Sequence, residues 1–106
     1  MVVFMEPVAG TEEEFNRWYN EHHLPERVSV PGIHSGRRYQ LSEGEGGAKY
    51  LAIYELEDEE VLHGETYLAL QHITKPMNFE RPKIQRLIYR QVFPEAGAYE
   101  DKSWTP

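Results

Sequence analysis

Apolar and polar residues follow two different periods along this chain, and the periods succeed one another in a simple order. Four short runs that are β-branched or alternate in polarity predict strands, at residues 2–5, 34–42, 49–56 and 84–93. Apolar residues spaced three and four apart predict helices over 11–24 and 59–71. The glycine-rich segment 43–47 predicts a hairpin connection between the second and third strands. The expected order is therefore strand, helix, strand, strand, helix, strand.

Sequence signals mark both ends of the first helix. Thr11 and Glu14 have the spacing of a capping box, in which the threonine hydroxyl accepts from a backbone amide and the glutamate reaches back to the cap amide. Pro25 disfavours helical geometry at the residue before it, so we expect this helix to end at about Leu24.

The second helix has a weaker start. Asp58 can cap it, but Gly64 destabilises a helix by about 1 kcal/mol relative to alanine. Glu65 falls within the apolar stripe, where a carboxylate needs a partner. The residues expected on the inner face of this helix are Val61, Leu62, Leu68 and Ala69.

This order of elements is that of an α+β fold, the ferredoxin-like βαββαβ sandwich, in which two helices cover one face of an antiparallel sheet. Residues 49–56 are almost continuously apolar, so we expect both faces of that strand to be buried. The uncovered sheet face then needs a partner, and a homodimer that joins two sheets into a dimeric α/β barrel is the economical solution. A monomer with a polar open face is the alternative. Residues 1–93 are expected to form the domain, and 94–106 a tail that is disordered or packed on a partner.

Composition narrows the class of protein. A chain of 106 residues with 40% hydrophobic and 27% charged residues suits one globular domain. Its net charge of −7 argues against nucleic acid as a partner, because phosphate binding needs clustered Lys and Arg. The sequence has no run of about 18 apolar residues, so no membrane span is expected. Without cysteine or a recognisable signal segment, a cytoplasmic location is expected.

Reactive side chains gather at the end of the first helix. Residues that share one helical face, at positions i, i+3, i+4 and i+7, are Phe15, Trp18, Tyr19 and His22. On this helical wheel His22 lies within the apolar stripe, and His23 lies about 100° away. An imidazole has a pKa of about 6.5, so either histidine could move a proton near neutral pH. A purely structural role for each histidine is the alternative.

Residues 18–27, with the sequence WYNEHHLPER, are followed by the turn 30–32 and the basic and aromatic segment 37–39, and together they resemble the EthD-like branch of the dimeric α/β barrel superfamily. The hallmark of that family is a W-Y-x-x-x-H-x-P helix end. The resemblance covers roughly residues 1–93 and implies a ferredoxin-like protomer, a homodimer and a small-molecule pocket between sheet and helices. Members include cofactor-free monooxygenases, muconolactone isomerase-like enzymes and polyketide cyclases, and others bind haem. Aligned by spacing from the proline, the resemblance places the pocket histidine on His23, whereas the helical wheel favours His22.

The leading hypothesis is an enzyme that acts on a small aromatic or polyketide-like molecule by histidine acid/base chemistry. Its catalytic residues would be His23, as base or acid, and His22, which would orient His23 or the substrate. The expected substrate-binding residues are Trp18, Tyr19, Arg38 and Tyr54. Arg38 or Arg37 would stabilise a developing enolate or phenolate, but neighbours on a strand point to opposite faces, so only one of them can reach the pocket. A surface or interface ion pair is the structural alternative for both arginines.

Two other functions stay open. One is a non-catalytic dimeric module that binds a ligand in the same pocket or serves as a scaffold. The other is haem binding through an exposed imidazole, although the sequence contains no haem-attachment pattern. The leading hypothesis needs no cofactor, and no metal site is expected because adjacent histidines on a helix point about 100° apart.

Overall fold

The computed structural model contains one antiparallel sheet. The structure describes residues 1–101 of the chain. Its strands are β1 (Val2–Glu6), β2 (Ile33–Gln40), β3 (Tyr50–Leu56) and β4 (Lys83–Leu87), in the spatial order β2-β3-β1-β4. The helical segments are α1 (Glu12–Trp18), the π-helix η1 (Tyr19–His23), α2 (Leu24–Val28), the 3₁₀-helix η2 (Glu59–His63) and α3 (Glu65–Ile73). The end of the expected tail, including Trp104, lies outside the described residues.

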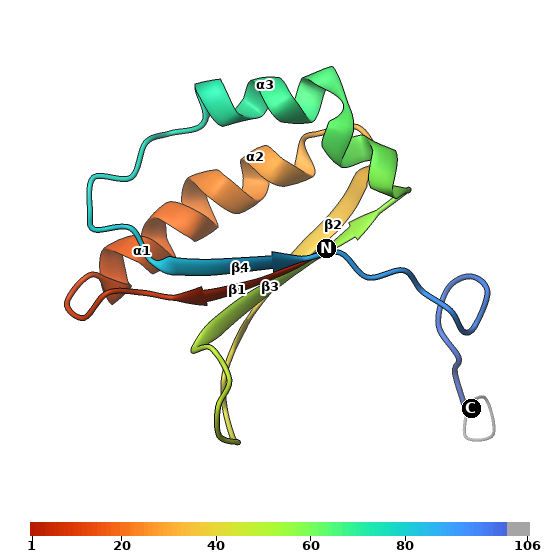
Figure 1. Ribbon diagram of the computed structural model, residues 1–106, viewed down its shortest axis with the longest axis horizontal. Coiled ribbons are helices and arrows are strands. Elements are labelled where there is room, and N and C mark those ends of the chain that lie inside the picture. The colour runs from red at the N-terminus through yellow and green to blue at the C-terminus, as the bar shows by residue number, and fades with distance from the viewer. Residues whose placement is uncertain (102–106) are drawn as a thin grey trace.

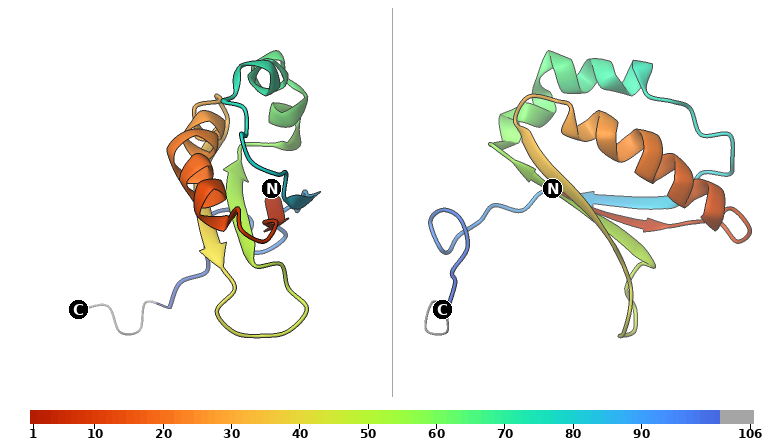
Figure 2. Two further views of the ribbon diagram at one scale, coloured as in Figure 1. Left: turned by 90° about the vertical axis from the view of Figure 1, so that its left-hand side faces the viewer. Right: turned by 180° about the vertical axis from the view of Figure 1, so that it is seen from behind.

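Two helical layers cover the same face of the sheet. One is the continuous run from α1 to α2, and the other is α3 (Figure 1). The side view in Figure 2 shows both layers on one side of the strands. Strand β1 lies in the middle of the sheet, antiparallel to both β3 and β4. The predicted α+β, ferredoxin-like order of elements is therefore confirmed.

The first helix does not end at Leu24, as the proline predicted, but continues to Val28. A π-turn precedes Pro25: the amide of Leu24 donates to the carbonyl of Tyr19, five residues back. This wider turn shifts the hydrogen-bond ladder by one residue. Pro25 then stands in the first turn of α2, where a missing N–H is tolerated. The prediction was wrong because it considered only an uninterrupted α-helix.

The capping signals had mixed outcomes. The Thr11 hydroxyl donates to the carbonyl of Val8 at 2.7 Å instead of capping α1, so the predicted capping box is not formed. The Asp58 carboxylate does cap a helix, because it accepts from the amide of Glu60 at 2.9 Å. The helix that it caps is the short η2.

The second predicted helix is divided in two at Gly64, whose backbone is extended. This break resets the helical phase, so one apolar stripe cannot run through both parts. Leu62 is buried as predicted, but Leu68 and Ala69 are exposed, and Tyr67 and Leu70 take the inner positions of α3. The expected inner face was therefore wrong for its second half.

The two faces of β3 differ in their burial. Tyr50, Ala52 and Tyr54 are buried beneath the helices. On the opposite face Ile53 is 40% exposed and Glu55 is exposed. Within the described residues of this single chain no layer covers the outer face, so burial of that face stays a prediction that depends on the homodimer.

Strand β4 ends at Leu87, whereas the alternating pattern predicted a strand to Phe93. Leu87 pairs with Val2, the first residue of β1, so β1 offers no further backbone partner. Residues 88–101 leave the sheet and extend away from the helices (Figure 1).

Candidate functional site

A cavity of about 850 Å³ lies between the inner face of the sheet and the helical layers. One wall comes from the run α1–η1–α2 and another from α3, and the segment 74–82 that joins α3 to β4 closes a further side. The lining residues with most chemical interest are Trp18, Tyr19, His23, Arg27, Tyr54, Tyr67, Lys75, Arg81 and Arg86.

The segment 74–82 is held against the first helix by polar contacts. The Trp18 indole N–H donates to the carbonyl of Lys75 at 2.8 Å. The Thr74 hydroxyl donates to the Glu26 carboxylate, which also accepts from the amide of Lys75 at 3.4 Å. These contacts therefore give the segment a defined place beside the cavity.

His23 lines the cavity and His22 does not. The His23 ring stacks on Trp18 with 4.7 Å between centroids, and it meets Tyr19 edge-on at 4.6 Å. The His22 side chain is 33% exposed, with Nε2 at 3.2 Å from Lys75 Nζ. The helical wheel, which placed His22 inward, was wrong because the π-turn rotates the following residues. The position implied by the family resemblance, His23, agrees with the structure.

The His23 imidazole is neutral and has a free nitrogen. Its Nδ1 atom is buried and has no hydrogen-bond partner among the described residues. Burial lowers the pKa of His23 to about 4, and the nearby charge of Arg27 acts in the same direction. A neutral imidazole carries one N–H donor and one acceptor nitrogen, so at neutral pH His23 can donate one hydrogen bond and accept another.

Tyr19 and Tyr54 form a buried hydroxyl pair beside this imidazole. Their oxygens are 2.6 Å apart, and either can be the donor. Burial raises the pKa of both phenols, so both keep their protons at neutral pH. One proton makes the mutual hydrogen bond, which leaves the second free to be donated to another acceptor.

Arg38 lies on the inner face of β2 but does not line the cavity. Its guanidinium donates to the side-chain oxygens of Asn16 and Asn20, both at 2.8 Å, and lies 4.6 Å from the centre of the Tyr19 ring. Arg37 is exposed, on the opposite face of the strand. As predicted, only one of the two arginines faces inward. This arginine, Arg38, contacts the first helix and does not line the cavity.

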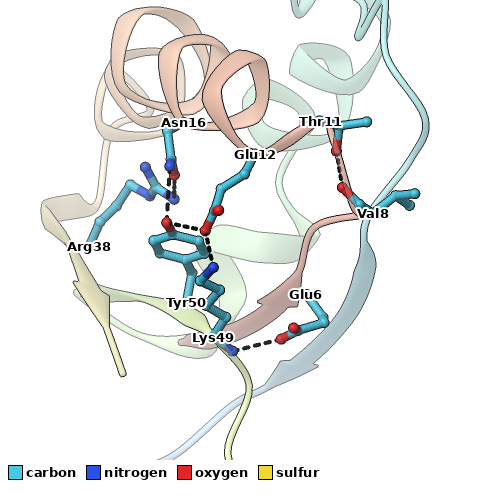
Figure 3. A network of polar contacts seen from close by, with 8 residues as sticks. All are labelled: Glu6, Val8, Thr11, Glu12, Asn16, Arg38, Lys49 and Tyr50. Carbon is cyan, nitrogen blue, oxygen red and sulfur yellow. Dashed lines mark hydrogen bonds and ion pairs between the residues drawn. The ribbon is translucent and has the colours of Figure 1, made fainter. Parts of the chain in front are cut away.

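The Arg38 contacts continue into a polar network beneath α1 (Figure 3). Asn16 donates from Nδ2 to the Tyr50 hydroxyl at 3.1 Å, and that hydroxyl donates to Glu12 at 2.6 Å. Glu12 in turn forms an ion pair of 2.6 Å with Lys49. This network fixes α1 on the sheet and thereby positions the aromatic wall of the cavity.

Arg27 is a cavity residue that the sequence patterns did not single out. It is only 9% exposed, and its Nη1 atom has no hydrogen-bond partner within residues 1–101. Its guanidinium lies 5.6 Å from the centre of the Tyr67 ring. Arg27 follows His23 by four positions, so both fall on one face once the helix continues past Pro25. The i, i+4 spacing of His23 and Arg27 across Pro25 is the sequence signal that could have identified Arg27 as a cavity residue.

Other site types find no support in the part of the chain that the structure describes. No three His, Cys, Asp or Glu side chains gather there as a metal-binding cluster. None of its helices combines the length and apolar character that crossing a bilayer requires.

The sheet, the helical layers on one face and the cavity between them define a ferredoxin-like α+β module. An ethyl tert-butyl ether D (EthD) family protein from Bacillus halodurans C-125 has a similar structure, with a TM-score of 0.52 and 12% identity, over 82% of this chain and 96% of that chain. HapK from Hahella chejuensis is similar with a TM-score of 0.51 and 10% identity, over 94% of this chain and 97% of that chain. No family model and no curated protein matches the sequence. The predicted resemblance to EthD-like proteins is thus confirmed at the level of the fold.

Proposed function

We propose that this protein binds a small aromatic or polyketide-like molecule in the 850 Å³ cavity and moves a proton on it with His23. The observation that carries this proposal is the buried Nδ1 of the neutral His23 imidazole, which lines the cavity and has no hydrogen-bond partner within residues 1–101. A buried polar atom without a partner costs free energy, so its retention favours a role for that atom. The stacked rings of Trp18 and His23 would hold a planar ligand.

The proposed step is the removal of an acidic proton from a carbon or oxygen of the ligand. The proton passes to His23, and the electron pair stays on the ligand as an enolate or phenolate oxygen. Of the two hydroxyls of Tyr19 and Tyr54, the one that does not donate to the other can donate a hydrogen bond to that oxygen. A negative charge developing beside His23 opposes the effect of Arg27, so the imidazole becomes more basic as the proton moves. His22 lies outside the cavity, with its Nε2 atom 3.2 Å from Lys75 Nζ, and takes no part in this step.

Base-catalysed exchange of hydrogen tests this step with a simple ketone in place of the natural substrate. We would follow the exchange of the benzylic hydrogens of 2-tetralone into D₂O by NMR, with wild-type protein, His23→Gln and His22→Gln. We expect wild-type protein to accelerate exchange, and His23→Gln to reduce this acceleration by about 100-fold. The His22→Gln variant is the matched control and should keep most of it. Binding of 2-tetralone without accelerated exchange would favour the non-catalytic ligand-binding module.

The outer face of the sheet supports the proposal of a homodimer. Strand register places several apolar side chains on this uncovered face, namely Val2, Phe4, Tyr39, Leu51, Ile53 and Leu87. Tyr39 is 46% exposed and Ile53 40% exposed. A contiguous apolar face of this kind is typical of an interface. Two copies joined through it would form the dimeric α/β barrel.

A further inference from the structure

We propose that the cavity binds its ligand through a carboxylate held by Arg27, so that the ligand class is a small aromatic or polyketide-like acid. This inference rests on the proposed function, because it assigns a chemical group to the ligand of the same cavity. It gives the ligand an orientation as well as a class.

The Arg27 guanidinium is a buried charge, and one of its nitrogens has no hydrogen-bond partner among the described residues. It is nine-tenths buried, it lines the cavity, and its Nη1 atom has no hydrogen-bond partner among the described residues. A buried charge normally has an ion-pair partner of opposite sign. The guanidinium instead lies over the face of the Tyr67 ring, at 5.6 Å. A ligand carboxylate would supply the missing partner, with the two-pronged geometry that arginine favours.

The charge of the cavity lining is opposite to that of the whole chain. In a chain with a net charge of −7, no Asp or Glu lines this cavity within the described residues. The cationic residues that line it are Arg27, Lys75, Arg81 and Arg86. Glu26, which follows Pro25 directly, accepts from the Thr74 hydroxyl and does not line the cavity. The lining therefore presents hydrogen-bond donors and positive charge, which suits an anion.

Arg27 is buried, whereas the other cationic residues of the cavity lining are exposed. Arg86 donates from Nη1 to the Tyr67 hydroxyl at 3.0 Å, and Lys75 Nζ is 3.2 Å from His22 Nε2. Arg81 and Arg86 are exposed, so water screens their charges. Arg27 combines burial with a missing partner. We therefore place the carboxylate at Arg27, in the cavity that the Tyr19 and Tyr54 pair also lines.

A pair of matched probes tests the assignment. We would measure the affinities of 2-naphthoate and its uncharged analogue 2-naphthamide by calorimetry, for wild-type protein, Arg27→Met and Arg37→Met. We expect the wild-type protein to bind naphthoate about 10- to 100-fold more tightly than naphthamide. Arg27→Met should bind the two probes with similar affinity. Arg37→Met removes the same charge from the exposed outer face and should keep the preference.

Each other outcome rejects a defined part of the proposal. Equal wild-type affinities for the two probes would overturn the carboxylate site and leave the proposed function standing. A preference that persists in Arg27→Met would overturn the assignment to Arg27. Binding of neither probe would overturn both the inference and the small-molecule cavity. If Arg27→Met does not fold, Arg27→Lys replaces it: a reduced preference supports the two-pronged contact, and an unchanged preference overturns it.

Discussion

The rings of His23 and Trp18 stack with 4.7 Å between their centroids and 28° between their planes, although His23 follows Trp18 by five positions. In a regular α-helix, residues five apart point about 140° away from each other. The π-turn at Tyr19–His23 removes most of that angle and brings the imidazole over the indole. The basic group and the aromatic wall of the cavity thereby form one surface.

The burial of His23 predicts a pH dependence of stability. Its pKa is about 4 in the folded protein and about 6.5 in an unfolded chain. As the pH falls below 6.5, the unfolded state takes up a proton that the folded state does not. His23 therefore lowers the free energy of unfolding between pH 6.5 and 4, by up to about 3 kcal/mol. Urea unfolding at pH 7, 5.5 and 4.5 should show this loss in the wild-type protein.

The matched variants separate His23 from the other titrating groups. His23→Gln should lose less stability than the wild-type protein over the same pH range. His22→Gln, which changes a side chain outside the cavity, should follow the wild-type profile. Parallel profiles for wild type and His23→Gln would contradict the burial of this imidazole.

The hydroxyl pair of Tyr19 and Tyr54 predicts strong coupling between two substitutions. Tyr19→Phe or Tyr54→Phe alone leaves a buried hydroxyl without its partner at 2.6 Å, which should cost about 1–3 kcal/mol. The double variant removes both hydroxyls, so its cost should fall below the sum by about 1 kcal/mol. Urea unfolding of all four proteins measures this cycle, with Tyr89→Phe, an exposed tyrosine beyond the end of β4, as a near-neutral control. Additive costs would mean that the two hydroxyls do not interact.

Gly36 allows the first helix to lie close to β2. A Cβ atom there would be 2.9 Å from Leu24 Cδ1 and 3.1 Å from the ring of Tyr54. Gly36→Ala should therefore lower the free energy of unfolding by about 1–3 kcal/mol, because a packed ring must move. Gly47→Ala is the control, since its Cβ would be 3.7 Å from Leu41. A thermal unfolding midpoint for Gly36→Ala equal to that of the control would count against this close packing.

From the uncovered outer face of the sheet we predict that the protein forms a homodimer in a concentration-dependent way. We expect sedimentation equilibrium to give twice the chain mass for the wild-type protein, and the single mass for Ile53→Lys. The lysine would place a charge among the apolar side chains of the face, where it would be desolvated in a dimer. Glu55→Lys, two residues along the same strand face, starts from an exposed charge and should keep the dimer. A wild-type monomer at high concentration would contradict the dimer.

The order of elements could be predicted from the sequence because the two periods of apolar residues are local signals. The short apolar runs around Val3 and Ala52 and the helical spacing of Phe15 and Trp18 identify the elements without tertiary information. The end of β4 could not be predicted in this way. Residues after Leu87 keep an alternating pattern, but Leu87 already pairs with Val2, and the backbone of Met1 is hydrogen-bonded to Tyr54 on β3 instead.

A helical wheel could not predict the orientation of the two histidines either. A wheel assumes one angle per residue, and the π-turn before Pro25 violates that assumption. The same assumption ended the helix at Leu24 and so left Arg27 out of the candidate site. Trp18, Tyr19 and Tyr54, which were predicted as substrate-binding residues, line the same cavity as His23, and they lie on elements that could be predicted from the sequence. Whether these residues bind a substrate stays a prediction.

Because of the π-turn, the residues before it and the residues after it do not follow one continuous α-helical periodicity. Before the turn, Asn16 is committed to Arg38 and Tyr50, which anchor the helix to the sheet. After the turn, His23 and Arg27 face the cavity. A substitution that shifts the angular position of the second half need not disturb the anchor of the first. Residues after the turn can therefore change the lining of the cavity while Asn16 keeps the first half of the helix attached to the sheet.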